Sequence, residues 1–290
     1  MSAATRERLK VVPAGGSAGA YVTGVDLSKP DDADAIAGIR SALRDHLVVA
    51  LPDQNLSLDD LERFTDALGG RAITPYVKPI DGRPYVIRIL KQPDEKLNFA
   101  NAWHTDLSYL EEPPSFTVLY CLETPPAGGD TVWANQYMAF DTLSAGLRDT
   151  LMGLNAVHSA GPAYGTGGYL DGVKDKMSTK IEPSKEAHAE QTHPAVIAHP
   201  ETGRAALYVN PVYTQRIAGW SKPESDGLLN HLYRHAVNEN FTWRLRWARG
   251  TLAIWDNRST QHFALNDYHG WRREMLRTSV KGSKPKAARR

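Results

Sequence analysis

The sequence predicts a mainly β fold with surrounding helices, in the form of a double-stranded β-helix or jelly roll. Short runs rich in β-branched residues and bounded by Gly or Pro recur along the chain, and they outnumber the helix-like segments. These runs do not alternate regularly with helices, as they would in a parallel α/β sheet. An antiparallel double sheet with helices packed outside it satisfies both observations.

The individual elements follow from local pattern. The segments 31–46 and 57–70 combine apolar residues at helical spacing with acidic or Ser starts, and Ser57 is a suitable N-cap. Longer helices are predicted over 136–154 and 223–238. The predicted strands are 20–27, 47–52, 85–91, 115–122, 131–134, 195–199, 206–210, 241–247, 251–257 and 273–280.

Length and composition restrict the class of protein. The 290 residues show no domain boundary, so a single domain over 1–290 is expected. A net charge of +1 gives no reason to expect a nucleic-acid or membrane partner. Cys121 is the only cysteine, which excludes an intrachain disulfide and a cysteine metal cluster. With no apolar leader in the first residues and no run of about 20 apolar residues, a cytoplasmic location is expected.

Two segments lack the periodicity of the rest. The stretch 159–194 is rich in Gly, Ser, Lys and Glu, and a loop of this length in a compact domain is commonly functional. We expect it to form a lid over a site. The basic segment 281–290 is poor in apolar residues, and we expect a flexible, solvated end.

Candidate metal ligands lie in two motifs far apart in the chain. His104 and Asp106, in "NAWHTDLSYL", would share one face of an extended strand end. His262 follows the apolar strand of "AIWDNRSTQHFAL", which a jelly roll can place beside the first motif. Two histidines and one carboxylate on one face of a metal suit non-haem Fe(II). They do not exclude a catalytic zinc site.

Two arginines favour the iron alternative. If 273–280 is a strand, Arg273 and Arg277 share a face and point into the cavity that holds the metal. Two buried guanidiniums need anionic partners, such as a dicarboxylate that chelates iron and an anionic substrate. The alternative is a basic exposed edge strand, and the arginines alone do not decide between the two.

Taken together, the motifs resemble the taurine dioxygenase (TauD/TfdA) family of Fe(II)/2-oxoglutarate-dependent dioxygenases. "WHTD" followed by "PP", then "GGDTVWAN", "HPETGR", "LAIWDNRSTQH" and "RR…R" occur in the family's order and spacing. The resemblance implies a jelly roll with Fe(II) bound by His104, Asp106 and His262. It further implies that 2-oxoglutarate and O₂ are co-substrates, with succinate and CO₂ as co-products of hydroxylation.

The same resemblance implies roles for further residues. Arg273 matches the arginine that pairs with the distal carboxylate of 2-oxoglutarate, and Thr131 matches its hydroxyl partner. Arg277 matches the arginine that holds the substrate anion in sulfonate-using relatives. Trp255 matches an aromatic residue near the site. Relatives are often dimers or tetramers, so a homo-oligomer is allowed, although no interface can be located from the sequence.

The sequence departs from the taurine pattern in the substrate region. Thr74 stands where taurine enzymes have a histidine that binds sulfonate, and Phe99 and Ala100 replace polar residues before "WHTD". We therefore expect the substrate to be a small anion with an apolar body. Arg277 would bind the anionic group, and the pocket would be lined by Thr74, Tyr76, Phe99 and Tyr213. Aryloxyalkanoates, sulfonates and alkyl sulfates fit this description, and hydroxylation beside an ether or sulfate oxygen would lead to cleavage. A zinc hydrolase and a non-catalytic sensor of 2-oxoglutarate or an organic anion are the alternative functions.

Overall fold

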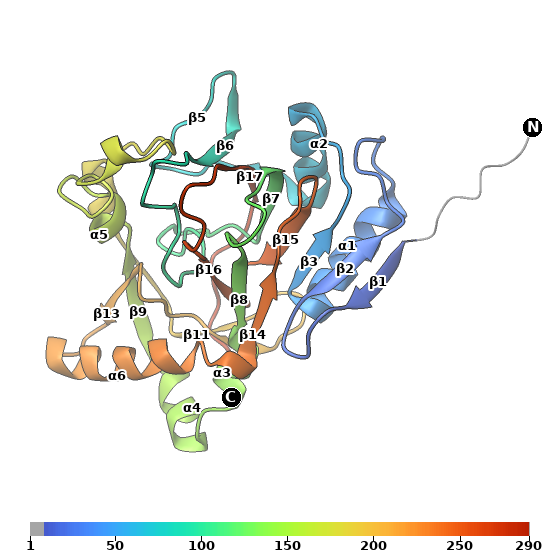
Figure 1. Ribbon diagram of the computed structural model, residues 1–290. Coiled ribbons are helices and arrows are strands. Elements are labelled where there is room, and N and C mark those ends of the chain that lie inside the picture. The colour runs from blue at the N-terminus through green and yellow to red at the C-terminus, as the bar shows by residue number, and fades with distance from the viewer. Residues whose placement is uncertain (1–8, 290) are drawn as a thin grey trace, which may run out of the picture.

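The computed structural model describes residues 9–289, which form a β-sandwich with helices on its outside (Figure 1). The larger sheet has nine strands and the smaller facing sheet has three. The large sheet runs in the order β1 (Lys10–Pro13), β2 (Ala20–Thr23), β3 (Val48–Leu51), β15 (Leu252–Asp256), β7 (Phe116–Glu123), β17 (Arg273–Val280), β6 (Arg83–Lys91) and β5 (Pro79–Ile80), with β4 (Arg71–Ala72) beside β17. The small sheet is β14 (Thr242–Leu245), β8 (Thr131–Asn135) and β16 (Thr260–Ala264). The predicted mainly β double-sheet fold is confirmed.

Two further small sheets complete the strands of the described range. One holds β10 (Glu190–Pro194), β9 (Asn155–Ser159) and β13 (Thr214–Ile217), and the other holds β11 (Val196–Ala198) and β12 (Ala205–Leu207). The helices are α1 (Ala33–His46), α2 (Leu58–Gly69), α3 (Gln136–Asp141), α4 (Ala145–Leu151), α5 (Gly161–Tyr164) and α6 (Lys222–His235), with 3-10 turns at Lys174–Lys176, Lys185–His188 and Glu239–Phe241. None of the helices within residues 9–289 is long and apolar enough to cross a membrane.

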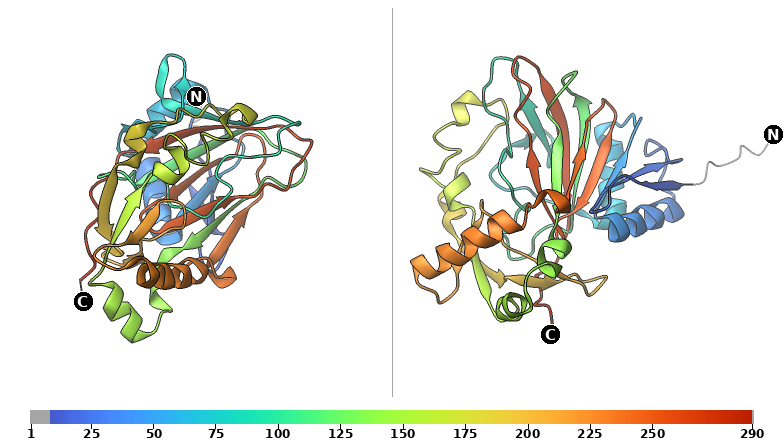
Figure 2. Two further views of the ribbon diagram at one scale, coloured as in Figure 1. Left: turned by 90° about the vertical axis from the view of Figure 1, so that its left-hand side faces the viewer. Right: turned by 60° about the horizontal axis from the view of Figure 1, so that its bottom comes forward.

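Strand β17 shows how the large sheet separates two cores. Leu276 and Val280 pack with α1 and α2 on one face, whereas Met275 faces the sandwich interior with Trp133 and Trp255. Because side chains alternate along a strand, Arg273 and Arg277 share the interior face with Met275. The helices α1 and α2 therefore cover the outer face of the sheet, and α6 lies on another side of the molecule (Figure 2).

Three local predictions need correction. The helix predicted over 136–154 is two helices, because Thr142 bonds its own hydroxyl back to the Met138 carbonyl (2.7 Å) and Ser144 starts a new helix. The polar sequence 190–194 forms strand β10 instead of ending a loop. The end predicted to be flexible is paired: Ala198 N–H donates to the Lys286 carbonyl, and Ala288 N–H donates to the Val196 carbonyl. Residue 290 of that segment lies outside the described residues, as do the first eight residues of the chain, on which the expectation of no apolar leader partly rests.

Candidate active site

His104, Asp106 and His262 meet inside the sandwich. One potential ligand atom from each lies within 4.8 Å of the others. The Oδ1 atom of Asp106 is 3.5 Å from His104 Nε2 and 3.9 Å from His262 Nε2. The two histidines are held by reciprocal backbone hydrogen bonds of 3.1 and 2.8 Å, which join the "WHTD" segment to β16. The structure thus brings the three predicted metal ligands together in one buried site.

The backbone that presents Asp106 differs from the strand end predicted for it. Only His104 forms a β-bridge, and Asp106 begins a turn in which Leu107 has φ 51°. Ala100, before the motif, has φ 67°. Residues with a side chain rarely adopt this left-handed region, and strained positions of this kind cluster at functional sites. The turn, and not strand alternation, aims the carboxylate at the two imidazoles.

Hydrogen bonds fix which atoms face the centre of the site. His104 Nδ1 lies 2.7 Å from the Ala102 carbonyl, which can only accept, so Nδ1 carries the proton and Nε2 keeps a free lone pair. The Thr117 hydroxyl donates to Asp106 Oδ2 over 2.7 Å, and the Asn257 amide donates to Thr117 Oγ1 over 2.9 Å. Oδ1 of Asp106 is left facing the histidines. Sequence reasoning did not identify Thr117 or Asn257.

The protonation states also suit a metal. Burial alone would raise the pKa of Asp106, but Arg277 and the two histidines outweigh it and hold the pKa well below its usual value. Burial, reinforced by His104, lowers the pKa of His262 well below its usual value. A carboxylate and a neutral imidazole are the forms that bind a divalent metal. Two nitrogens and one oxygen leave three positions of an octahedral ion open, which fits Fe(II) with a chelating co-substrate.

Arg273 is a buried cation that forms no ion pair with any residue from 9 to 289. Its side chain is 5% exposed, and within residues 9–289 its Nε and Nη2 atoms have no hydrogen-bond acceptor. The guanidinium lies 5.7 Å from the centre of the Trp247 ring, whose Nε1–H donates to the Thr131 hydroxyl over 2.9 Å. Thr131 therefore retains its own proton to donate. A buried guanidinium and a hydroxyl donor that both contact the same tryptophan ring are suited to the carboxylate of a ligand.

Arg277 lies beside Asp106, at the wall of a cavity of about 200 Å³. Its Nη2 atom is 2.9 Å from Asp106 Oδ1. His104 and Asp106 form part of the same wall, and most of the remaining wall is apolar or aromatic. That part includes Phe99, Leu107, Tyr164, Leu170, Met177 and Tyr213. The cavity thus joins one cation and the metal-binding residues to an apolar body.

Only some of the predicted substrate-binding residues line this cavity. Arg277, Phe99 and Tyr213 line the cavity. Thr74 and Tyr76 do not line it: the Thr74 hydroxyl contacts the Ser279 hydroxyl (3.3 Å), and Tyr76 packs on Tyr164 with ring centres 5.7 Å apart. Their contact with substrate therefore stays a prediction. Trp255 packs against His262 with ring centres 4.8 Å apart.

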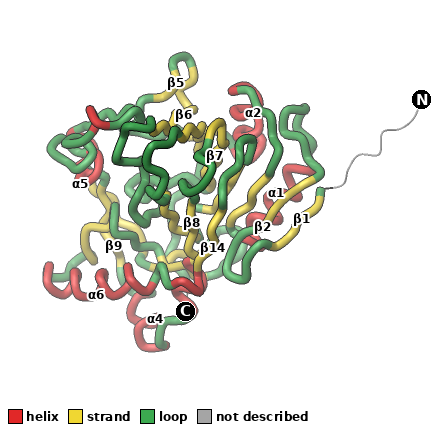
Figure 3. The backbone as a smooth tube through the Cα atoms, in the orientation of Figure 1, coloured by secondary structure: helices red, strands yellow, loops and turns green. Residues whose placement is uncertain are grey.

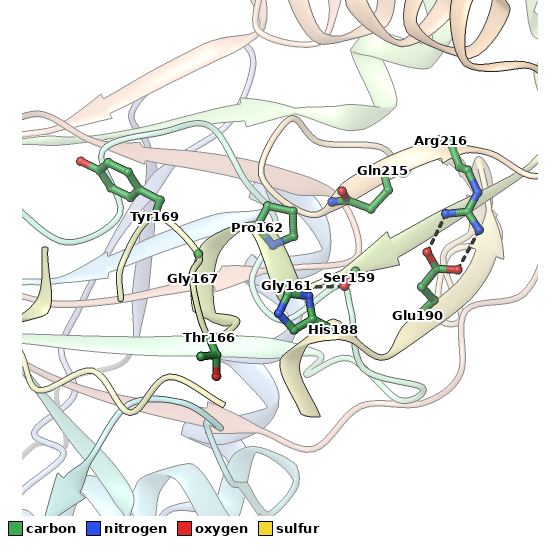
Figure 4. A pocket seen from close by; sticks show the side chains of 11 residues that line it. Ser159, Gly161, Pro162, Thr166, Gly167, Tyr169, His188, Glu190, Gln215 and Arg216 are labelled. Carbon is green, nitrogen blue, oxygen red and sulfur yellow. Dashed lines mark hydrogen bonds and ion pairs between the residues drawn. The ribbon is translucent and has the colours of Figure 1, made fainter. Parts of the chain in front are cut away.

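The segment 159–194 forms one side of the cavity and borders a second hollow. Figure 3 shows this segment mostly as loop with short helical turns. The second hollow, of about 420 Å³, is polar, and Glu190 and Arg216 point toward each other at its edge with Nη1 and Oε1 2.6 Å apart (Figure 4). Pro162 and Tyr169 line both spaces. Residues 162–169 are therefore a partition with open space on either side.

A jelly-roll sandwich with two histidines and one carboxylate at its centre defines a class of mononuclear metal oxygenases. Residues 10–279 match the family model described as taurine catabolism dioxygenase TauD, TfdA family, and the chain belongs to this family.

Similar proteins support this family membership over nearly the whole chain. An alpha-ketoglutarate-dependent sulfate ester dioxygenase of Pseudomonas putida is 36% identical over 96% of this chain and 91% of its own. An alkylsulfatase of Acinetobacter baylyi is 33% identical, with 92% and 83% covered. The crystal structure of a taurine dioxygenase from Burkholderia xenovorans superposes with a TM-score of 0.80 at 33% identity, covering 96% of this chain and 92% of the other.

The protein is therefore an oxidoreductase, an Fe(II)- and 2-oxoglutarate-dependent dioxygenase with O₂ as co-substrate. The zinc hydrolase and the non-catalytic sensor find no support in these relatives.

Proposed function

We propose that the protein hydroxylates a C–H bond of a small organic anion with an apolar body, and that an alkyl sulfate ester is the preferred substrate type. The observation that carries this proposal is the position of Arg277, a buried cation beside the metal-binding residues in an otherwise largely apolar cavity. An anionic head at Arg277 places the adjoining carbon chain along the apolar wall and near the metal. Relatives named for sulfate esters favour this type over sulfonates and aryloxyalkanoates.

In this proposal His104, Asp106 and His262 hold Fe(II). When bound with 2-oxoglutarate and O₂, the iron supplies the oxidation that inserts oxygen into the substrate C–H bond, and 2-oxoglutarate leaves as succinate and CO₂. The protein keeps the ligand atoms oriented through the Ala102 carbonyl and the Thr117 hydroxyl. Hydroxylation of the carbon next to a sulfate ester oxygen yields an unstable product, so the net outcome is cleavage.

Arg273 and Thr131 bind the distal carboxylate of 2-oxoglutarate. The buried guanidinium has free donor atoms, and the Thr131 hydroxyl keeps its proton because it accepts from Trp247. Together they provide charge and hydrogen bonds to a planar carboxylate. Arg277 is left for the substrate, since it faces the cavity that Phe99 and Tyr213 line.

The segment 159–194 acts as a lid in this proposal. It supplies cavity-wall residues such as Tyr164, Leu170 and Met177, and it borders the second hollow into which it could move. Closing over bound substrate would exclude water from the reacting centre.

The partners and location in the cell belong to the proposal as well. We propose a cytoplasmic enzyme without nucleic-acid or membrane partners, which acts alone or as a homo-oligomer. The near-neutral charge and the single buried cysteine support this, because they favour neither a polyanionic partner nor a disulfide-stabilised extracellular protein.

Succinate formation tests the proposed reaction directly. Protein reconstituted anaerobically with Fe(II) is given 2-oxoglutarate and O₂ with hexyl sulfate, hexanesulfonate or an aryloxyacetate. We expect succinate to rise most with hexyl sulfate, together with released sulfate. Equal low succinate with and without each compound would contradict the proposed substrate class.

A further inference from the structure

Four tyrosines from separate segments of the chain form a cluster beside the metal-binding residues. This tyrosine cluster consists of Tyr76, Tyr109, Tyr164 and Tyr213. Ring centres lie 4.8 Å apart for Tyr109 and Tyr213, 5.9 Å for Tyr76 and Tyr109, and 6.4 Å for Tyr109 and Tyr164. Tyr213 in turn meets the His104 ring edge-on at 6.1 Å. Tyr164 and Tyr213 of the cluster line the cavity, and Tyr109 packs against both of them.

Two hydroxyls of the cluster are available as hydrogen-bond donors. Tyr109 is 5% exposed, and its hydroxyl has no hydrogen-bond partner in the part of the chain that the structure describes. Tyr164 is also 5% exposed and lines the cavity together with Arg277. Burial raises the pKa of Tyr164 to about 12 and that of Tyr109 well above its usual value. Both phenols are therefore neutral and keep their protons at physiological pH.

Charged groups of the site influence the same two phenols. Besides burial, Arg277 lowers and Asp106 raises the pKa of both Tyr109 and Tyr164. For Tyr76 the causes are burial and Glu186. Tyr164 shares the cavity wall with Arg277, and Tyr109 packs against the two cavity tyrosines, Tyr164 and Tyr213.

The shape of the ligand head group determines what these donors can do. A carboxylate is planar, and a guanidinium alone can satisfy its two oxygens in a bidentate pair. A sulfate or sulfonate head is tetrahedral, so oxygens remain outside the guanidinium plane and need donors from another direction. Neutral phenols beside the guanidinium supply such donors without adding charge.

We propose that the hydroxyls of Tyr109 and Tyr164 donate hydrogen bonds to a sulfate or sulfonate head group held by Arg277, and that they select it over a carboxylate. This inference rests on the proposed function, in which Arg277 binds the substrate anion. Thr74 does not line the cavity, so its hydroxyl leaves this role to the phenols. Because Tyr164 belongs to the segment 159–194, binding of the head group also holds the lid.

The test compares two ligands with the same alkyl chain and different heads. Hexyl sulfate and heptanoate are titrated calorimetrically into protein loaded with Fe(II) and 2-oxoglutarate, without O₂, so that no turnover occurs. We expect wild-type protein to bind hexyl sulfate at least about tenfold more tightly than heptanoate. Tyr109→Phe and Tyr164→Phe should each weaken hexyl sulfate about five- to tenfold and change heptanoate less than about twofold.

A matched control removes a buried phenol hydroxyl outside the cavity. Tyr208 is buried against His158 and His193, and Tyr208→Phe should leave both affinities unchanged. Equal binding of the two heads by wild-type protein, or equal losses for both heads in the Phe variants, would overturn the inference. If one Phe variant does not show the wild-type circular dichroism spectrum, it is misfolded. The head-group preference of wild-type protein and the affinities of the other Phe variant then test the inference.

The binding assay tests the role of the phenols, and the succinate assay tests the proposed reaction, so either can give a negative result without the other. Succinate formed with heptanoate as well as with hexyl sulfate, at equal affinities, would leave the dioxygenase reaction in place and remove the role of the phenols. A strong head-group preference without succinate from any compound would keep the role of the phenols and contradict the proposed reaction.

Discussion

Thr117 offers the sharpest test of how the fold positions the metal site. Its hydroxyl donates to Asp106 Oδ2 over 2.7 Å and accepts from the Asn257 amide over 2.9 Å. Thr117 and Asn257 are both buried, as is Asp106. Thr117→Val keeps the shape of the side chain while it removes the donor to the carboxylate and the acceptor for the amide. The carboxylate can then rotate away from the two histidines.

The expected magnitudes follow from these contacts. A hydrogen bond to a buried charged group contributes roughly 1.5–3 kcal/mol, and an unsatisfied buried amide adds a cost of about 1–3 kcal/mol. We therefore expect the free energy of unfolding to fall by roughly 2.5–6 kcal/mol. Loss of a partner that orients a metal ligand weakens metal binding about 10- to 100-fold.

Thr278→Val is the matched control in the same sheet. Thr278 is buried on the opposite face of β17 and pairs with the Thr65 hydroxyl (2.7 Å), away from the metal ligands. It should lower the free energy of unfolding by only about 0.5–1.5 kcal/mol and leave metal affinity unchanged. Anaerobic Fe(II) titration and urea unfolding measure both quantities. Equal metal affinity in Thr117→Val and wild-type protein would refute the positioning role of Thr117.

Three further outcomes are expected. Arg273→Ala should raise the 2-oxoglutarate concentration needed for half-maximal succinate formation at least about tenfold. Arg277→Ala should instead raise the hexyl sulfate concentration needed, by a similar factor. Equal effects of both changes on one ligand would contradict the assignment of one arginine to each ligand. Burial, reinforced by His193, lowers the pKa of His158 to about 3, so below pH about 6.5 the unfolded chain takes up a proton that the folded protein does not. As the pH decreases below this value, the free energy of unfolding should decrease by up to about 1.4 kcal/mol per pH unit. His158→Gln should reduce the difference between the urea midpoints measured at pH 7.5 and pH 5.5, and an unchanged difference would exclude His158 as its cause. Limited proteolysis should cut within 159–194, and 2-oxoglutarate with hexyl sulfate should suppress the cut if this segment is a lid; cleavage that ligands leave unchanged would count against it.

Much of the fold follows from local sequence pattern. Ser57 does cap α2, in a reciprocal capping box with Asp60. Strand β17 alternates between two cores, as its spacing of apolar and charged residues predicts. Strands β9, β10 and β13 were not predicted, because their short polar sequences are stabilised by pairing with one another and not by local preference.

The metal-binding residues could be predicted, whereas the residues around them could not. The motif containing His104 and Asp106 has a distinctive local sequence, and His262 follows an apolar strand. Thr117 faces Asp106 because strand β7 lies behind the turn, and Tyr164 reaches the cavity from a segment without periodic pattern. These contacts depend on the tertiary packing of distant segments, which local pattern does not contain. An inward-facing threonine in β7 was the one signal that could have suggested Thr117.

The stoichiometry of the reaction in wild-type protein and in Asp106→Ala tests the central claim most directly. With Fe(II), 2-oxoglutarate and hexyl sulfate, wild-type protein should consume one O₂ for each succinate formed and each sulfate released. Asp106→Ala should form neither product, because it removes the one anionic side chain among the three metal-binding residues. Unchanged succinate and sulfate release by Asp106→Ala would contradict a dioxygenase site built on His104, Asp106 and His262.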